Sequence, residues 1–373
     1  MIPASVLATM MFFNIGNVGN LIQANHILTH DSWNPLSLSE RSEGAITGMV
    51  DQLNDPYSYY LNSEDYKDMM EEVNGTYEGV GVYLATAPDA DYTVVIAPIK
   101  GTPAFEAGLL AGDEILQING EDMAGKCADE ISTMIKHGEK THFVFDVRRG
   151  TEILTFEMDR QVIDIPSVDY RFLEGQNGLA YISISSFAAN TFAEVQEAIS
   201  SLEEQGEIRG ILLDLRNNPG GSVTSVLDVA DMFLAEGEHI LWVESKNGEE
   251  CYDSENADPC SYPLVVLVNE NSASASEILS GALQDNKRAT LVGTTTFGKG
   301  IIQTVFPLDD GVAVKVTTAE YLSPDKHKIH EIGITPDIKT ELGSDDFTLI
   351  YSLDPSVDPQ LKKGIETLLK KIK

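Results

Sequence analysis

Three short segments of this 373-residue chain contain residues that could carry out nucleophilic catalysis. The first, residues 271–277, has three serines between an apolar run and a stretch with helical spacing. A serine at the start of a helix lies beside N–H groups that the helix leaves unpaired, and these groups stabilise a negatively charged oxygen. Serines are also ordinary N-caps, and capping accounts for most serines at the start of a helix.

The second segment places Lys299 between Gly298 and Gly300, in a stretch that otherwise predicts a strand. Glycines adopt backbone conformations that other residues cannot, so the lysine can be directed inward. A lysine that loses its water on burial has a lowered pKa and can act as a neutral base. The alternative is an exposed lysine in a glycine-rich turn.

The third segment, residues 217–221, reads Asn-Asn-Pro-Gly-Gly and follows directly on a continuous apolar run. Such a turn exposes consecutive backbone N–H groups, which form a concave site for an anion. The alternative is an ordinary connection from a strand to a helix.

The surrounding pattern predicts the elements that would position these segments. Continuous apolar runs are typical of strands buried on both faces. They occupy residues 210–216, 262–268 and 289–293, and a further strand is expected at 312–318. Helical spacing at 223–235 and 275–286 alternates with these runs, which predicts an α/β domain with a sheet covered by helices.

The upstream part has shorter elements. The predicted strands of residues 78–160 are 81–85, 92–96, 114–118, 142–147 and 153–158, and the predicted helices are 103–109 and 128–136. Residues 31–75 are predicted to be helical with a turn at 54–58, and an amphipathic helix is predicted at 358–372.

Composition argues against nucleic-acid binding. The net charge is −34, and nucleic-acid binding requires clustered Lys and Arg, so we predict no nucleic-acid partner. The 42% of hydrophobic residues is enough for packed cores, and at ~150 residues per domain the length predicts two or three domains.

The cysteines and histidines predict no metal site. Cys127, Cys251 and Cys260 form no C-x-x-C pair, and the seven histidines are scattered, so we predict no metal and no cofactor. Cys251 and Cys260 flank an acidic turn and could form a disulfide in an oxidising compartment; two free thiols are the alternative.

The first thirty residues contain no Asp, Glu, Lys or Arg. Residues 2–13 are mostly apolar but shorter than the ~20 residues that span a membrane. The pattern favours the remnant of a membrane anchor over an apolar helix packed on this protein or on a second copy. We therefore expect an extracytoplasmic protein anchored to a bacterial cell envelope.

Together these segments resemble the carboxyl-terminal processing proteases, serine peptidases of family S41 that use a Ser–Lys dyad. The matching segments are residues 54–58, 215–221, 271–277, 297–300 with Gln303, and 333–337. The resemblance runs from about residue 40 to residue 340.

The resemblance implies a role for each matching position. Ser274 would be the nucleophile, Lys299 the general base and Gln303 the residue that orients the lysine. The N–H groups of Gly220 and Ala275 would form the oxyanion hole. The residues alone leave the choice among the three serines open.

The distances expected from strand and helix geometry test the roles of Gln303 and Asp285. On a regular strand Lys299 and Gln303 would be ~13 Å apart, so we expect a bulge or bend near Gly298 or Gly300. Asp285 matches a family aspartate, but on a helix it would lie ~16 Å along the axis from Ser274, so we expect it to be structural.

Residues 76–162 resemble a PDZ domain. A substrate C-terminus would add as a strand between residues 81–85 and helix 128–136. The residues that would bind its carboxylate are Gly79, Val80, Gly81 and Val82.

The fold class implied by the resemblance is α/β, a ClpP/crotonase-like protease core with a small β-rich PDZ domain and terminal helices. The predicted parts are an anchor remnant (1–30), a helical region (31–75), the PDZ domain (76–162), the protease core (163–342) and a helical tail (343–373).

The predicted function is cleavage of protein or peptide substrates with a free C-terminus, by a chain that could form a homo-oligomer. One alternative is a PDZ peptide-binding scaffold with an inactive protease domain, which the intact Ser274, Lys299 and Gln303 disfavour. The other is a crotonase-like acyl-CoA enzyme, which the Ser–Lys pair and the PDZ-like segment disfavour.

Overall fold

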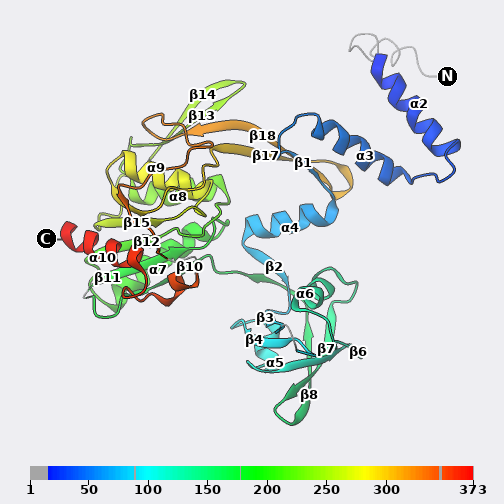
Figure 1. The fold of residues 1–373 in the computed structure, drawn as a ribbon, viewed down its shortest axis with the longest axis horizontal. Helices are drawn as coiled ribbons and strands as arrows, with labels where there is room; N and C mark the ends of the chain where they lie inside the picture. Colours follow the sequence, from blue (N-terminus) through cyan, green and yellow to red (C-terminus); the bar gives the residue numbers. More distant parts are fainter. Residues whose placement is uncertain (1–15, 88–89, 177, 344–346, 373) are drawn as a thin grey trace. The chain divides into compact units, whose positions relative to one another are not determined.

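The computed structural model describes residues 16–87, 90–176, 178–343 and 347–372, and the apolar run at 2–13 lies outside them (Figure 1). The chain forms two compact units. One comprises residues 1–67 and 302–319, and the other comprises residues 68–301 and 320–373. The first unit is therefore discontinuous in sequence, which no local pattern had indicated.

The first unit contains α2 (Gly16–His30), α3 (Leu38–Asp51), β1 (Tyr59–Leu61) and most of β17 (Ile301–Pro307) and β18 (Ala313–Leu322). A reciprocal pair of hydrogen bonds between Ser37 and Glu40 caps α3. The predicted break at residues 54–58 is confirmed, and β1 directly after it pairs antiparallel with β18. In the part of the chain that is described, no helix has the length and apolar character needed to cross a membrane.

A β-rich domain opens the second unit after α4 (Ser63–Asn74). Its strands are β2 (Thr76–Gly79), β3 (Val82–Ala85), β4 (Val94–Pro98), β5 (Glu114–Ile118), β6 (Glu121–Asp122), β7 (His142–Arg149), β8 (Glu152–Asp159) and β9 (Gln161–Asp164). The main sheet has the order β3-β4-β5-β7-β8, and α5 (Pro103–Ala107) and α6 (Ala128–His137) accompany it. Ile131 and Ile135 of α6 are buried in its core, as their helical spacing predicted.

A six-stranded sheet forms the core of the rest of this unit. Its order is β10 (Val168–Phe172), β11 (Leu179–Ile184), β12 (Gly210–Asp214), β15 (Leu264–Val268), β16 (Ala289–Gly293) and β19 (Ile338–Lys339). Only β10 of these is antiparallel to its neighbour. Every residue of β12 and β15 is buried, which explains their continuous apolar runs.

Helices cover this sheet. They are α7 (Thr191–Gln205), α8 (Val223–Phe233), α9 (Ala275–Asp285) and α10 (Pro359–Lys371). Leu361, Ile365 and Leu368 of α10 pack against β12, β15 and β16, and the approach is closest at Gly364, where a Cβ would lie 2.8 Å from Leu267. The α/β class and the PDZ-like domain are therefore as expected.

A buried ion network joins α10 to the end of β12. The Arg216 guanidinium donates to both Asp214 oxygens and to Asp358 Oδ2, 2.7 Å away, and the Arg216 and Asp358 side chains are fully buried. Asp358 Oδ1 also accepts the N–H groups of Gln360 and Leu361, which caps α10. One carboxylate thus fixes both the helix and the residue that precedes the turn at 217–221.

Asp358→Ala should lower the free energy of unfolding by about 3–5 kcal/mol, because it leaves a buried guanidinium without one partner. Asp358→Asn should cost less, since an asparagine still caps the helix. Urea denaturation followed by tryptophan fluorescence measures both.

Glu366→Ala is the matched control on the same helix. It removes an exposed partner of Lys363 and should change the stability by no more than ~0.5 kcal/mol. Equal effects of Asp358→Ala and Glu366→Ala would contradict the role given to the network.

Candidate active site

Ser274 lies at the junction between β15 and α9, as the N-cap of the helix. Its backbone has φ 53° and ψ −114°, a conformation that side-chain-bearing residues rarely adopt. Such strain costs about 1–3 kcal/mol and persists only where the surroundings enforce it. The junction therefore holds this serine in a position that an ordinary N-cap would not need.

The three serines of this segment differ in burial and bonding. Ser272 and Ser276 are fully buried and donate hydrogen bonds to the carbonyl oxygens of Leu215 and Asn218, at 2.8 and 3.0 Å. Ser274 is half-buried. Of the three serines, only Ser274 is in contact with solvent, whereas the other two hydroxyls support the turn at residues 215–218.

Glu277, one turn into α9, connects the serine to the lysine segment. Its side chain is fully buried, and Oε2 accepts the N–H of Ser274 at 2.9 Å and that of Lys299 at 2.8 Å. Its Oε1 accepts the Gly298 N–H at 2.7 Å and the Thr296 hydroxyl at 2.5 Å. One carboxylate therefore brings together backbone groups that are 25 residues apart in the chain.

Tyr321 joins the same two residues through their carbonyl groups. Its hydroxyl lies 2.9 Å from the Ser274 oxygen and 2.6 Å from the Lys299 oxygen, and the residue is 1% exposed. Burial, together with the charge of Glu277, raises the pKa of Tyr321 well above its usual value. The hydroxyl therefore stays protonated and available as a donor.

Sequence reasoning missed the roles of Glu277 and Tyr321. The Ser-x-x-Glu spacing of Ser274 and Glu277 is a capping-box signature and could have indicated the first contact. Tyr321 lies 47 residues beyond Ser274, and no local pattern points to it.

Lys299 lies on irregular backbone, as its spacing from Gln303 predicted. Regular strand geometry begins only at Ile301, and Gly298 has φ 91°. A Cβ on Gly300 would lie 2.4 Å from the His330 backbone nitrogen. Position 300 must therefore be glycine for this segment to pack against residues 329–333. The half-buried Lys299 is thereby held between two close backbone contacts.

The turn at residues 217–221 packs directly on the serine. Gly220 has φ 105°, and a Cβ there would lie 2.7 Å from Ser274 Cβ and 2.9 Å from the Ala275 nitrogen. The two predicted oxyanion donors, Gly220 and Ala275, are thus neighbours.

The Gly220 N–H is engaged in this structure. It donates to Asn218 Oδ1 at 2.8 Å, and Asn218 is fixed in turn by donating to the Ile184 carbonyl. Among the residues that the structure describes, none accepts a hydrogen bond from the Ala275 N–H. One predicted donor is therefore open, and the other must leave Asn218 before it can bind an oxyanion.

Two further predicted residues have other partners. The Gln303 amide on β17 donates to the Tyr57 carbonyl at 2.6 Å, within the first unit, so its role toward Lys299 stays a prediction. The Asp285 carboxylate, at the far end of α9, accepts the Asp325 N–H at 3.0 Å and the Ser323 hydroxyl. It has the structural role expected of it.

The predicted carboxylate loop connects β2 to β3. Gly81 has φ 80°, and a Cβ there would lie 2.3 Å from Thr102, whose hydroxyl donates to the Gly81 carbonyl. Gly79 ends β2, Val80 is fully buried and Val82 begins β3. In the described sheet β3 is the edge strand, so its outer side is available to an added strand.

Three parts of the chain match the sequence models of known protein families. The sequence model of peptidase family S41 matches residues 178–340, a PDZ domain model matches 94–149, and the model of the activating protease CtpB N-terminal domain matches 13–65. A carboxyl-terminal-processing protease of Synechocystis sp. is 40% identical over 307 residues, which are 81% of this chain and 72% of that protein. The carboxy-terminal processing protease CtpA of Bacillus subtilis is 36% identical over 325 residues, 86% and 68% of the two chains.

Solved structures give the same result. The photosystem II D1 C-terminal processing protease superposes with a TM-score of 0.50 at 32% identity, over 84% of this chain and 85% of that one. The tricorn protease shares the fold with a TM-score of 0.51 at 18% identity, over 94% of this chain and 36% of its own.

Glu277→Gln should loosen this site, because an amide replaces an oxygen that accepts two hydrogen bonds. Each buried N–H left without an acceptor costs about 1–3 kcal/mol. Hydrogen exchange measured by mass spectrometry should therefore be faster in the peptides that contain Ser274 and Lys299.

Glu270→Gln is the control, since Glu270 is exposed in the same connection and, among the described residues, accepts a hydrogen bond only from the Thr294 hydroxyl. Unchanged exchange in Glu277→Gln would show that the carboxylate does not hold the two segments together.

Proposed function

Because the chain belongs to the carboxyl-terminal processing proteases of peptidase family S41 and is a serine peptidase with a PDZ domain, we propose that Ser274 and Lys299 form its catalytic dyad. The observation that carries this proposal is the Glu277 carboxylate, which binds the N–H groups of both residues. The half-buried state of Ser274, beside two fully buried serines, supports it as the nucleophile.

In the proposed reaction, neutral Lys299 takes the proton of the Ser274 hydroxyl as the oxygen attacks the scissile carbonyl. Lys299 then protonates the leaving amine, and water hydrolyses the acyl-enzyme. The Ala275 N–H, at the positive end of α9, stabilises the oxyanion, a contribution of about 3 kcal/mol per donor in serine proteases. Gly220 is the second donor, after its N–H leaves Asn218.

We further propose that the PDZ domain binds the C-terminus of protein substrates. An extended peptide would pair with β3, and the N–H groups of residues 80–82 would bind its terminal carboxylate. The edge position of β3 and the left-handed Gly81 support this proposal.

The second candidate is a peptide-binding scaffold whose protease domain is inactive. The hydrogen bond from the Gly220 N–H to Asn218 favours it, because that donor is occupied. Binding of peptides without turnover would distinguish it from the protease.

Ser274→Ala and Lys299→Ala should each reduce cleavage of an unfolded protein by on the order of 10⁴–10⁶-fold, as removal of a nucleophile or its base does in other serine proteases. A gel-based or fluorescent cleavage assay measures this loss. Circular dichroism should show that both variants keep the fold.

The controls are Ser200→Ala, on the exposed face of α7, and Lys363→Ala, at a half-buried position of α10; both should cleave at the wild-type rate. Full activity in either dyad variant would refute the assignment.

A peptide with a free apolar C-terminus should bind the Ser274→Ala protein at least about tenfold more tightly than its amidated form does. The amidated peptide has no terminal carboxylate to accept hydrogen bonds from the N–H groups of residues 80–82. Fluorescence anisotropy with a labelled peptide measures both affinities. Gly81→Ala should abolish the difference, since the new Cβ would collide with Thr102.

Gly101→Ala is a closely matched control. Gly101 also has φ 80°, but no atom lies within 4 Å of a Cβ placed there, so it introduces the same backbone strain without the collision. Equal affinities for the free and amidated peptides would contradict recognition of the C-terminus.

A further inference from the structure

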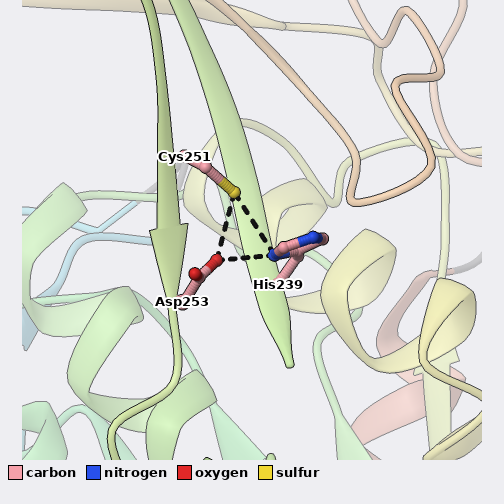
Figure 2. Close-up of side chains that lie close together, drawn as sticks. All are labelled: His239, Cys251 and Asp253. Carbon is pink, nitrogen blue, oxygen red and sulfur yellow. Dashed lines mark hydrogen bonds and ion pairs between the residues drawn. The ribbon is translucent and has the colours of Figure 1, made fainter. Parts of the chain in front are cut away.

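Three side chains of metal-binding type converge on the hairpin of β13 (His239–Ser245) and β14 (Gly248–Asp253) (Figure 2). His239 Nδ1 lies 2.6 Å from Asp253 Oδ1 and 3.4 Å from Cys251 Sγ, and the Cys251–Asp253 distance is 3.1 Å. Within the described residues, no other group of three such side chains has all its ligand atoms within 4.8 Å of one another.

The hairpin register explains why they meet. His239 pairs directly with Asp253, and Cys251 precedes Asp253 by two residues, so it projects from the same face of β14. A register shift between His239 and Leu241 bends the strand at this point. Bulges of this kind redirect side chains, and here the bend lies beside the histidine.

The arrangement differs from a proton relay. In a Cys–His–Asp relay the thiol and the carboxylate contact different nitrogens of the imidazole ring. Here both contact the same nitrogen, Nδ1, as the dashed lines in Figure 2 show. The nitrogen, the sulfur and the oxygen all lie within 3.4 Å of one another, close enough for one ion to contact all three.

We propose that His239, Cys251 and Asp253 bind a single Zn²⁺ ion, with water as the fourth ligand. Zinc favours this mixture of imidazole, thiolate and carboxylate, in tetrahedral geometry. With Zn–S at ~2.3 Å and Zn–N or Zn–O at ~2.0–2.1 Å, tetrahedral ligand atoms lie ~3.3–3.6 Å apart. The two sulfur distances already approach these values, and the His239–Asp253 pair must open by ~0.7 Å.

The side chains have the freedom that this opening needs. His239 and Asp253 are 48% and 47% exposed, so an ion and its water can reach the cluster from solvent. Binding breaks the Cys251 S–H bond, forms a Zn–S bond and releases the proton to solvent.

A second hairpin of the chain provides an internal comparison. His142 on β7 pairs with Asp159 on β8 at 2.8 Å, and the residue two before Asp159 is Glu157 rather than cysteine. Glu157 faces the other ring nitrogen, Nε2, at 3.9 Å. The two carboxylates of this second cluster therefore lie at different nitrogens of the ring, where one ion cannot bind both together with a single nitrogen. This cluster should not bind zinc tightly.

The ion would hold the hairpin closed and take no part in peptide cleavage. Asn286, which caps the C-terminal end of α9, donates to the His239 carbonyl at 2.8 Å. Ser274 lies at the opposite end of that helix, ~16 Å along the axis. The proposal is therefore independent of the Ser–Lys dyad.

Titration of the reduced, metal-free full chain with Co²⁺ tests the site directly. We expect a thiolate-to-cobalt charge-transfer band in the near ultraviolet that saturates at one equivalent and disappears when Zn²⁺ is added. Cys251→Ser should lose the band, whereas Cys127→Ser and Cys260→Ser, which remove the other two free thiols, should keep it.

Competition for Zn²⁺ against a chromophoric chelator gives the affinity. Loss of a residue that only hydrogen-bonds a metal ligand weakens metal binding by ~10–100-fold. His239→Ala and Asp253→Asn change the proposed ligands themselves and should weaken Zn²⁺ binding by more than that. His142→Ala should leave the affinity unchanged. Circular dichroism of each variant shows whether the fold is retained.

Two results would overturn the proposal. One is the absence of a charge-transfer band at one equivalent of Co²⁺. The other is a band or a Zn²⁺ affinity that survives Cys251→Ser, because either would place the metal elsewhere.

Discussion

One buried carboxylate, that of Glu277, holds the serine turn and the lysine segment of the protease domain together. A fully buried Glu277 is costly unless each of its oxygens accepts hydrogen bonds, and the chain supplies four donors to it. These donors come from the serine turn and from the lysine segment. Hydrogen bonds to a charged group are worth about 1.5–3 kcal/mol each, enough to offset the strain of about 1–3 kcal/mol at Ser274. The same carboxylate thus makes the strained serine tolerable and fixes the position of the lysine.

The turn that would bind the oxyanion depends on a second buried network, built from distant parts of the chain. Arg216 precedes the turn, and its guanidinium is fixed by Asp214 of β12 and by Asp358 at the start of α10. Asn218, within the turn, accepts the Ala273 N–H and the Ser276 hydroxyl through its carbonyl. A helix near the C-terminus therefore helps to position a turn that lies some 140 residues earlier in the sequence.

The sequence predicted those parts of the fold in which burial leaves an unambiguous pattern. The strands 114–118 and 289–293 were predicted with their observed bounds, because apolar runs ended by turns leave few alternatives. The hairpin of β13 and β14 was not predicted, since β14 is mostly exposed and polar. His239 becomes a neighbour of Cys251 and Asp253 only through cross-strand register, which spacing along the chain does not encode. For the active site, the resemblance selected Ser274, whereas Tyr321 could be found only from the structure.

The engaged N–H of Gly220 is also compatible with the proposed mechanism. In the absence of substrate the N–H donates to a neutral amide oxygen, so no buried donor is left unsatisfied. A developing oxyanion is a charged and therefore stronger acceptor, which can draw the N–H away from Asn218. The new bond then forms as charge accumulates on the carbonyl oxygen, and an interaction made only in the transition state lowers the barrier instead of tightening substrate binding. Asn218 would in this way set how much of the oxyanion hole exists before the substrate reacts.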